Sequence, residues 1–261
     1  MTRAIILAAG TGSRLGNRTA RLPKCLVDLV GQPLLEWQLR ALRAAGIDDV
    51  TIVTGFEAQQ LEAFAVATVH NPRYAETNMV ASLMCARHVF DGHDDVVIAY
   101  GDIVYESRLV ELLGEPAAPI TVVVDRQWRA LWEQRMDDPL TDAETLRIDS
   151  RGRLLEIGKE ATDYAQIEAQ YVGMIGVKAD FALEFVATHD SLDADATYDG
   201  RHKDQMYMTS FLQHFIDSGI EVAATLTDSG WLEVDTEHDL AAYETLHAQG
   251  RLAQFVRLVG A

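Results

Sequence analysis

Short apolar runs alternate with stretches of helical periodicity along the first part of the chain. Leu35, Leu39 and Leu42 recur at helical spacing within a stretch that a glycine ends. Further helices are expected at 57–65 and 77–90, and buried strands at 3–9, 49–55, 68–71 and 95–102. Strands that alternate with helices form parallel βαβ units, so we predict an α/β sheet with helices on both faces.

The second part of the chain, from about residue 116, has a different character. A hairpin is expected at 145–159 and a polar loop at 188–204. The other expected elements are strands at 120–125, 170–178 and 221–227, a helix at 206–219, and a last helix whose capping box is Thr236 with Asp239. Because no linker or repeat interrupts the sequence, we predict a single domain over 1–261 with a small α+β elaboration on one side.

The charge balance excludes two classes of partner. The 261 residues include 40 acidic and 22 basic side chains, which give a formal net charge of −18. Such a field repels nucleic acid and anionic membrane surfaces, so we expect neither as a partner. Cys25 and Cys85 form no zinc or disulfide pattern, and the sequence has no recognisable signal peptide or membrane span. The expected location is therefore the cytoplasm.

A glycine-rich loop, LAAGTGSRLG, begins at Leu7 at the end of the first strand. Its glycines, Gly10, Gly12 and Gly16, are spaced too widely for the dinucleotide-binding fingerprint. Lys24 stands between a proline and a cysteine, which excludes the P-loop pattern. Glycines after a buried strand still let backbone N–H groups approach phosphate, although a sharp turn alone also uses them.

This loop and the Pro-Lys pair that follows it together resemble the signature of small nucleotidyltransferases with a MobA-like fold. The matching residues are Leu7, Ala8, Ala9, Gly10, Gly12, Ser13 and Arg14, then Pro23 and Lys24. The resemblance implies a Rossmann-like, mixed and mostly parallel sheet, which binds the nucleotide in about 1–115 and the acceptor in about 116–261. It also implies nucleotide contacts from the loop residues, including Thr11, and from Gly101 at the end of the fourth strand.

Two basic residues and a metal ion are expected to neutralise phosphate charge in the reaction. Arg14 can fork onto phosphate oxygens, and Lys24 adds a compact charge near the α-phosphate, so both are candidate catalytic residues. Asp102 ends a buried strand and suits Mg²⁺, which prefers one or two carboxylates with phosphate oxygens and water. The resemblance implies the same role for Asp235, with capping of the last helix as its alternative.

The stretch 71–83 resembles the small cytidylyltransferases that act on phosphocholine, aminoethylphosphonate and related compounds. The residues that match their pattern are Asn71, Tyr74, Asn78, Ser82 and Leu83. Asparagine and serine side chains both donate and accept hydrogen bonds, which suits the edge of a pyrimidine. We therefore expect Asn78 and Ser82 to contact CTP, with helix capping as the alternative role of Asn78.

Candidate contacts to the acceptor come from the second part of the chain. Trp128, Trp132, Tyr171 and Trp231 could surround a quaternary ammonium group, and Asp125 and Glu233 could bind an ordinary amine. Lys159 is our candidate for holding the acceptor phosphate and is counted among the catalytic residues. The spacing of Trp128 and Trp132 is also that of a buried helix face.

The resulting hypothesis is a Mg²⁺-dependent cytidylyltransferase that transfers CMP from CTP to a small phosphonate or phosphate monoester and releases pyrophosphate. Aminoethylphosphonate, hydroxyethylphosphonate, phosphonoformate, phosphocholine and phosphorylated amino acids stay open as acceptors. The alternatives are a sugar-1-phosphate or molybdopterin nucleotidyltransferase of the same superfamily and, from another class, an inactive nucleotide-binding regulator. A homodimer is also left open.

Overall fold

A computed structural model describes residues 1–114, 116 and 118–258. Its main sheet has the strand order β14-β8-β11-β6-β1-β4-β5. These strands are β1 (Thr2–Ala8), β4 (Val50–Thr54), β5 (Ala67–His70), β6 (Asp95–Tyr100), β8 (Ile120–Asp125), β11 (Gln170–Val177) and β14 (Val222–Thr227). Within the described residues, β11 alone runs antiparallel to its neighbours in this sheet. The prediction of a mixed, mostly parallel sheet is confirmed.

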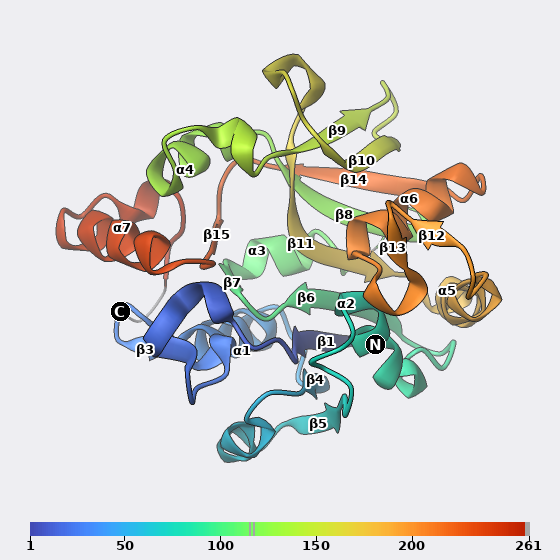
Figure 1. Ribbon diagram of the computed structural model, residues 1–261, viewed down its shortest axis with the longest axis horizontal. Helices are drawn as coiled ribbons and strands as arrows, with labels where there is room; N and C mark the ends of the chain where they lie inside the picture. The colour runs from blue at the N-terminus through green and yellow to red at the C-terminus, as the bar shows by residue number, and fades with distance from the viewer. Residues whose placement is uncertain (115, 117, 259–261) are drawn as a thin grey trace.

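Helices cover both faces of the sheet, as expected (Figure 1). One face packs against α1 (Leu34–Ala44), α3 (Ser107–Glu111), α4 (Trp128–Arg135) and α7 (Glu237–Ala248). The other face packs against α2 (Met79–Cys85), α5 (Ala179–Ser191) and α6 (Met208–Asp217). Strand β1 serves both faces, because Ala4 and Ile6 join the first core while Ile5 and Leu7 join the second.

Smaller pairs of strands lie outside this sheet. The expected hairpin is formed by β9 (Glu144–Ile148) and β10 (Leu154–Glu160), and Figure 1 shows it beside β14 at the top of the view. The other pairs are β7 (Ile103–Tyr105) with β15 (Trp231–Glu233), β2 (Asp28–Leu29) with β3 (Gln32–Pro33), and β12 (Thr197–Tyr198) with β13 (Arg201–His202).

Short 3₁₀ helices fill several connections. They are Ser13–Thr19, Lys24–Leu26, Ala58–Phe64, Arg87–Val89, Pro139–Thr141, Tyr164–Gln166, Lys203–Gln205 and Leu252–Gln254. The segment 57–65, expected as an ordinary helix, is therefore 3₁₀, with left-handed backbone at both ends (Glu57 and Ala65).

Two expectations about the second part change. Residues 188–191 of the expected loop are the last turn of α5, and the β12–β13 pair structures part of the remainder. Helix α5 has Phe181, Ala182, Phe185 and Val186 buried at helical spacing, a pattern that the sequence analysis did not use. The boundary expected near 115 falls at residues outside the described ones. No helix in the described residues is long and apolar enough to cross a membrane.

Candidate active site

The glycine-rich loop opens onto a cavity of about 160 Å³ at the carboxyl ends of β1 and β6. Backbone segments pack closely against one another at this cavity, and glycines make that approach possible. A Cβ added at Gly101 would lie 2.6 Å from the carbonyl oxygen of Leu7, and one at Gly55 would lie 2.5 Å from that of Ala9. The residues around this first cavity are Leu7, Ala8, Ala9, Gly10, Lys24, Cys25, Tyr74, Thr77, Asn78, Met79, Ser82, Tyr100, Gly101 and Asp102.

Hydrogen bonds hold the wall of the first cavity that 71–82 provides. The Asn71 amide donates to Thr77 Oγ1 and to Ser82 Oγ, both at 2.9 Å. Asn78 is the N-cap of α2: its Oδ1 accepts from the Met79 N–H at 2.8 Å, and its amide donates to a backbone carbonyl at 3.3 Å. Asn78 and Ser82 thus line the cavity, and the alternative role of Asn78 as a cap is also present.

The remaining loop residues lie apart from this first cavity. Thr11 and Ser13 are exposed and outside the lining of the described cavity, so their contact with a nucleotide stays a prediction. Gly12 has a left-handed backbone with φ 63°, and a Cβ there would lie 2.9 Å from Lys24 Cβ. Its missing side chain therefore lets Lys24 pack against the loop.

Lys24 lies between two carboxylates from distant parts of the chain. Its Nζ donates to Asp102 Oδ2 at 2.6 Å and also to Asp235 Oδ1. Sheet pairing explains their meeting, because β15 pairs with β7 and the Val234 N–H donates to the Asp102 carbonyl at 2.9 Å. Arg14 reaches the other oxygen of Asp235 at 3.0 Å.

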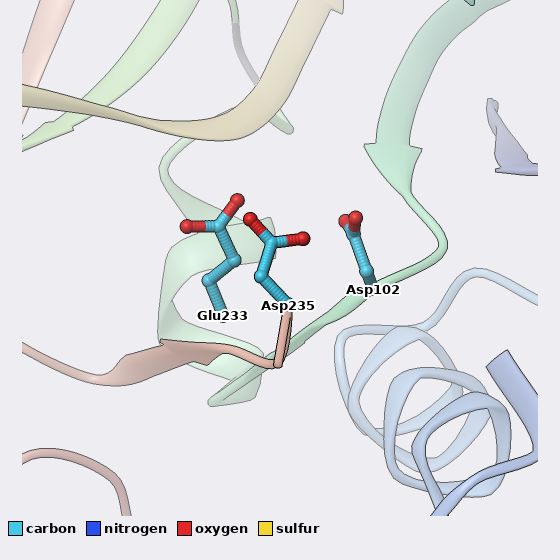
Figure 2. Close-up of side chains that lie close together, drawn as sticks. All are labelled: Asp102, Glu233 and Asp235. Atoms are coloured by element: carbon cyan, nitrogen blue, oxygen red, sulfur yellow. The ribbon is translucent and has the colours of Figure 1, made fainter. Parts of the chain in front are cut away.

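A third carboxylate joins this cluster. Ligand oxygens of Asp102, Glu233 and Asp235 all lie within 4.8 Å of one another. Figure 2 shows Asp235 between Glu233 and Asp102, which follows β6, with the three carboxylates at one level of the view. The second oxygen of Asp102, Oδ1, is buried without a hydrogen-bond partner among the described residues. Buried carboxylate oxygens that lack a donor suit a divalent cation.

Electrostatics in the cluster is dominated by burial and by these pairs. Burial alone would lower the pKa of the Lys24 ammonium, but Asp102 and Asp235 outweigh it and raise that pKa. Burial alone would raise the pKa of the Asp235 carboxyl. The nearby positive charges, of which Lys24 has the largest effect, outweigh burial and hold that pKa below its usual value. Burial raises the pKa of Glu233 to about 8 in spite of the nearby Arg135.

Arg135 supports the cluster from the core side. Its side chain is 1% exposed, and it lies 2.7 Å from Glu233, 3.3 Å from Asp239 and 3.7 Å from Asp235. Asp239 in turn accepts from the backbone N–H groups of Asp235 and Thr236, both at 2.8 Å. The expected capping box of α7 is confirmed, and it fixes the backbone that carries Asp235.

A second cavity of about 480 Å³ lies on the other side of this cluster. It shares Met79 and Tyr100 with the first cavity, and its lining includes Arg14 and Asp235. The other residues that line it are Ile103, Trp132, Asp142, Glu144, Gln170, Tyr171, Val172, Gly173, Tyr207, Met208, Thr209, Trp231 and Glu233. Tyr171 and Trp231 are among them, although Trp231 is only 1% exposed, and their contact with an acceptor stays a prediction.

The positions of Asp125 and Trp128 do not support the acceptor contacts expected of them. Asp125 is 1% exposed and accepts hydrogen bonds from the Trp231 ring at 2.9 Å and from the Ser229 and Gln127 N–H groups at 3.0 and 2.8 Å. Its carboxylate therefore has a structural role: it joins the end of β8 to the segment that leads into β15. Trp128 is 4% exposed, packs against Trp132 and Tyr164, and belongs to the core face of α4.

Lys159 also lies outside the described cavities. It is exposed on β10, and its ammonium pairs with Glu156 at 2.8 Å. Hydrogen bonding to Glu156 raises its pKa, as is typical of a surface pair. The expectation that Lys159 holds the acceptor phosphate is therefore not supported by its position.

Several residues of the site escaped the sequence analysis as site residues. Glu233 was expected only as a contact to an amine of the acceptor; its place beside Asp235 in the carboxylate cluster was missed, although alternation along a strand could have put both on one face. Glu144 begins a hairpin strand, and Thr209 is in the first turn of α6. Arg135 is a single arginine in a helix and carries no sequence signal of its burial.

Comparisons with known proteins find similar sequences over most of the chain. The family model of the MobA-like NTP transferase domain matches residues 4–158. The chain is 37% identical over 250 residues to a CTP:phosphoglutamine cytidylyltransferase of Campylobacter jejuni, covering 91% of this chain and 97% of that protein. It is 30% identical to a 2-aminoethylphosphonate cytidylyltransferase of Lancefieldella rimae over 65% of this chain and 66% of the relative.

Solved structures share the fold. A CTP:phosphocholine cytidylyltransferase from Streptococcus pneumoniae superposes with a TM-score of 0.71 at 21% identity, over 94% of this chain and 99% of that one. An inositol-1-phosphate CTP transferase from T. maritima superposes with a TM-score of 0.73 at 18% identity, over 98% of each chain. At these identities the likeness concerns the fold alone.

Proposed function

This chain belongs to the family of MobA-like NTP transferase domains and is a nucleotidyltransferase; we propose that it transfers CMP from CTP to the phosphate or phosphonate group of a small acceptor. The observation that carries the proposal is the position of the Lys24–Asp235 ion pair. Lys24 lines the first cavity and Asp235 lines the second, so the pair marks the place where two bound substrates would meet.

The first cavity supports nucleotide binding through its shape. Gly10 and Gly101 present backbone on part of its lining, and Asn78 and Ser82 add polar atoms on one wall. Selection of cytosine is proposed from the relatives, both of which use CTP or form a cytidylyl product by name. The Arg14 side chain pairs with Asp235 but is 63% exposed, so it can turn toward phosphate oxygens.

The carboxylate cluster fits Mg²⁺. Asp102 and Asp235 would hold the ion with Glu233 as third ligand, and the unpartnered Asp102 Oδ1 supplies an oxygen that no protein donor uses among the described residues. When bound, Mg²⁺ supplies positive charge to the phosphate oxygens, which this chain of net charge −18 otherwise provides only through a few basic residues.

The reaction needs no protein base. An ionised oxygen of the acceptor forms a bond to the α-phosphorus of CTP, the bond from that phosphorus to the bridging oxygen breaks, and pyrophosphate leaves with the electron pair. Phosphonates and phosphate monoesters are already ionised at neutral pH, so no proton has to be removed. Lys24 and Arg14 would bind and orient the phosphates, and catalysis rests on positioning and charge.

Pyrophosphate release tests this proposal directly. The enzyme is assayed with Mg²⁺, with each of CTP, UTP, GTP, ATP and dTTP, and with 2-aminoethylphosphonate, hydroxyethylphosphonate, phosphonoformate, phosphocholine, O-phosphoserine and glucose 1-phosphate. We expect turnover with CTP and a phosphonate or phosphate monoester. Turnover with another triphosphate and glucose 1-phosphate would replace the proposal with a sugar nucleotidyltransferase. The absence of release with every pair would favour the nucleotide-binding regulator.

A further inference from the structure

The second cavity is more acidic than nucleotide transfer requires. Besides Glu233 and Asp235 of the cluster, Asp142 and Glu144 line it, and Arg14 is the one basic residue in its described lining. An acceptor that carried only a phosphate or phosphonate would meet this wall with charge of the same sign. Acidic walls favour a ligand that also carries a positive group.

Among the described residues, Glu144 is the one carboxylate of this wall without an ion pair. The side-chain amide of the buried Gln170 fixes the backbone of Glu144. It accepts a hydrogen bond from the Glu144 N–H at 3.2 Å and donates one to the Glu144 carbonyl at 2.5 Å. The Glu144 side chain is half-buried, and the charges that act on it are those of Asp142 and Asp199, which are both negative. Asp142, by contrast, accepts a hydrogen bond from Trp132 at 3.1 Å.

One other polar group of this cavity lacks a hydrogen-bond partner. The Tyr171 hydroxyl lines the same cavity as Glu144 and is buried without a partner among the described residues. Aromatic rings complete the wall, since Tyr100 and Tyr171 pack edge to face with centroids 5.7 Å apart. A carboxylate and a hydroxyl that can both accept are suited to a cation that donates N–H bonds.

We infer that the acceptor carries a protonated amino group beside its phosphate or phosphonate, and that the Glu144 carboxylate binds this group, with the Tyr171 hydroxyl as a second acceptor. This inference rests on the proposed function for the identity of the reacting group. A quaternary ammonium has no N–H bond to donate and would leave both oxygens unpaired. The substrate class is thus an aminoalkyl phosphonate, an aminoalkyl phosphate or a phosphorylated amino acid.

The test compares acceptors that differ only at the ammonium position, in the wild type and in Glu144→Gln. The pairs are 2-aminoethylphosphonate with 2-hydroxyethylphosphonate, and phosphoethanolamine with phosphocholine. We expect the primary amine to be preferred in each pair. Glu144→Gln should raise KM for the amines by about 10- to 100-fold, the range for a lost hydrogen bond to a charged group, while changing KM for hydroxyethylphosphonate less than about 3-fold.

A matched variant controls for general charge effects. Glu160 is opposite Glu144 in the hairpin register but is exposed and outside the described lining of the cavity, so Glu160→Gln should keep the preference for amines. Equal loss with amino and hydroxy acceptors in Glu144→Gln, or preference for phosphocholine, would overturn the inference.

Binding separates this inference from the proposed function. Calorimetric titration of the wild type and Glu144→Gln with 2-aminoethylphosphonate, without nucleotide, needs no turnover. If no acceptor reacts but the wild type binds the amine more tightly than the variant and more tightly than hydroxyethylphosphonate, the proposed function fails and the ammonium site stands. If reaction occurs with hydroxyethylphosphonate and no amine binds, the ammonium site fails alone.

Discussion

The Arg135 guanidinium lies 2.7 Å from the Glu233 carboxylate and thereby joins α4 to the strand that leads to Asp235. Four acidic side chains lie within 4.0 Å of this one guanidinium: Asp142, Glu233, Asp235 and Asp239. The cation balances carboxylates that would otherwise repel one another in the protein interior.

Replacement of Arg135 by methionine should therefore destabilise the protein strongly. Removing one partner of a buried ion pair leaves uncompensated charge, which costs about 3–5 kcal/mol. Chemical denaturation measures the change. Arg129→Gln is the matched control, because Arg129 is on the same helix in an exposed pair with Glu133 and should cost less than about 1 kcal/mol. Equal losses in the two variants would contradict the bridging role of Arg135.

Asp102→Asn should lower turnover by at least about 10²-fold, the size of effect expected when charge stabilisation at a reacting phosphate is lost. The measurement is pyrophosphate release at saturating CTP and acceptor. Asp137→Asn, an exposed change of the same kind, should leave turnover unchanged. A chelator should abolish activity in the wild type, and added Mg²⁺ should restore it. Activity that survives the chelator would remove the metal from the proposal.

The two lysines singled out by the sequence should behave differently. Lys24→Met removes the ammonium between Asp102 and Asp235, so we expect kcat to fall by at least about 10²-fold. Lys159→Met removes an exposed pair with Glu156, and kcat/KM should change less than about 3-fold. A large loss of kcat/KM in Lys159→Met would return this residue to the acceptor site.

Gly101→Ala should disturb both stability and nucleotide binding. The added methyl group would lie 2.6 Å from the Leu7 carbonyl oxygen, and forced overpacking of this kind costs about 1–3 kcal/mol. Thermal unfolding with and without CTP measures both effects. Gly114→Ala is the comparison, because its Cβ would lie 3.4 Å from the nearest atom. A fully stable Gly101→Ala variant with normal CTP binding would show that β1 and β6 can separate without cost.

The Glu144 carboxyl should make amine binding pH-dependent. Burial, with Asp142 and Asp199, raises its pKa to about 7, so the empty site becomes neutral as the pH falls below that value. KM for 2-aminoethylphosphonate should therefore rise with falling pH. Hydroxyethylphosphonate supplies the control for titration of the phosphonate itself, and Glu144→Gln should remove the difference between the two profiles. Parallel profiles in the wild type would contradict a charged Glu144 at the amine.

The raised pKa of Glu144 also makes the stability of the folded protein depend on pH. The folded-state pKa lies above the ordinary value of 4.5, so ionisation of Glu144 opposes folding from about pH 4.5 upward and most fully above about pH 7. Glu144→Gln should consequently unfold at a higher temperature than the wild type at pH 8, and this advantage should shrink toward pH 5. A melting temperature below that of the wild type at pH 8 would contradict the burial of this charge.

Local sequence patterns predicted the parts of the site that depend on short-range geometry. Strand periodicity and the loop glycines placed Leu7 and Gly101 at one edge, and the structure brings Lys24, Asp102 and Asp235 together there. Pairing of β7 with β15 decides which distant carboxylates meet, and no local pattern encodes that pairing.

The aromatic residues show where sequence reasoning fails in the second part. The sequence does not show whether a tryptophan faces a ligand or the core: Trp128 and Trp231 are both buried in the core, and only Trp231 also lines the second cavity. Asp125 similarly resembles a binding carboxylate until its three donors are seen. Burial of Arg135 and Glu144 depends on packing between α4, β9 and β15, which only the folded chain defines.

The reversed direction of β11 has a consequence for redesign. Strand β11 starts at the edge of the sheet where β6 and β8 end. Gln170 and Tyr171 at its start therefore pair with Asp125 and Val124 at the end of β8. The insertion 126–169 therefore begins and ends at the same rim of the sheet and supplies part of the second cavity. Its hairpin, 144–160, is the part open to exchange: substituting it while keeping α4 and Arg135 should retune which acceptor is accepted and leave the carboxylate cluster in place.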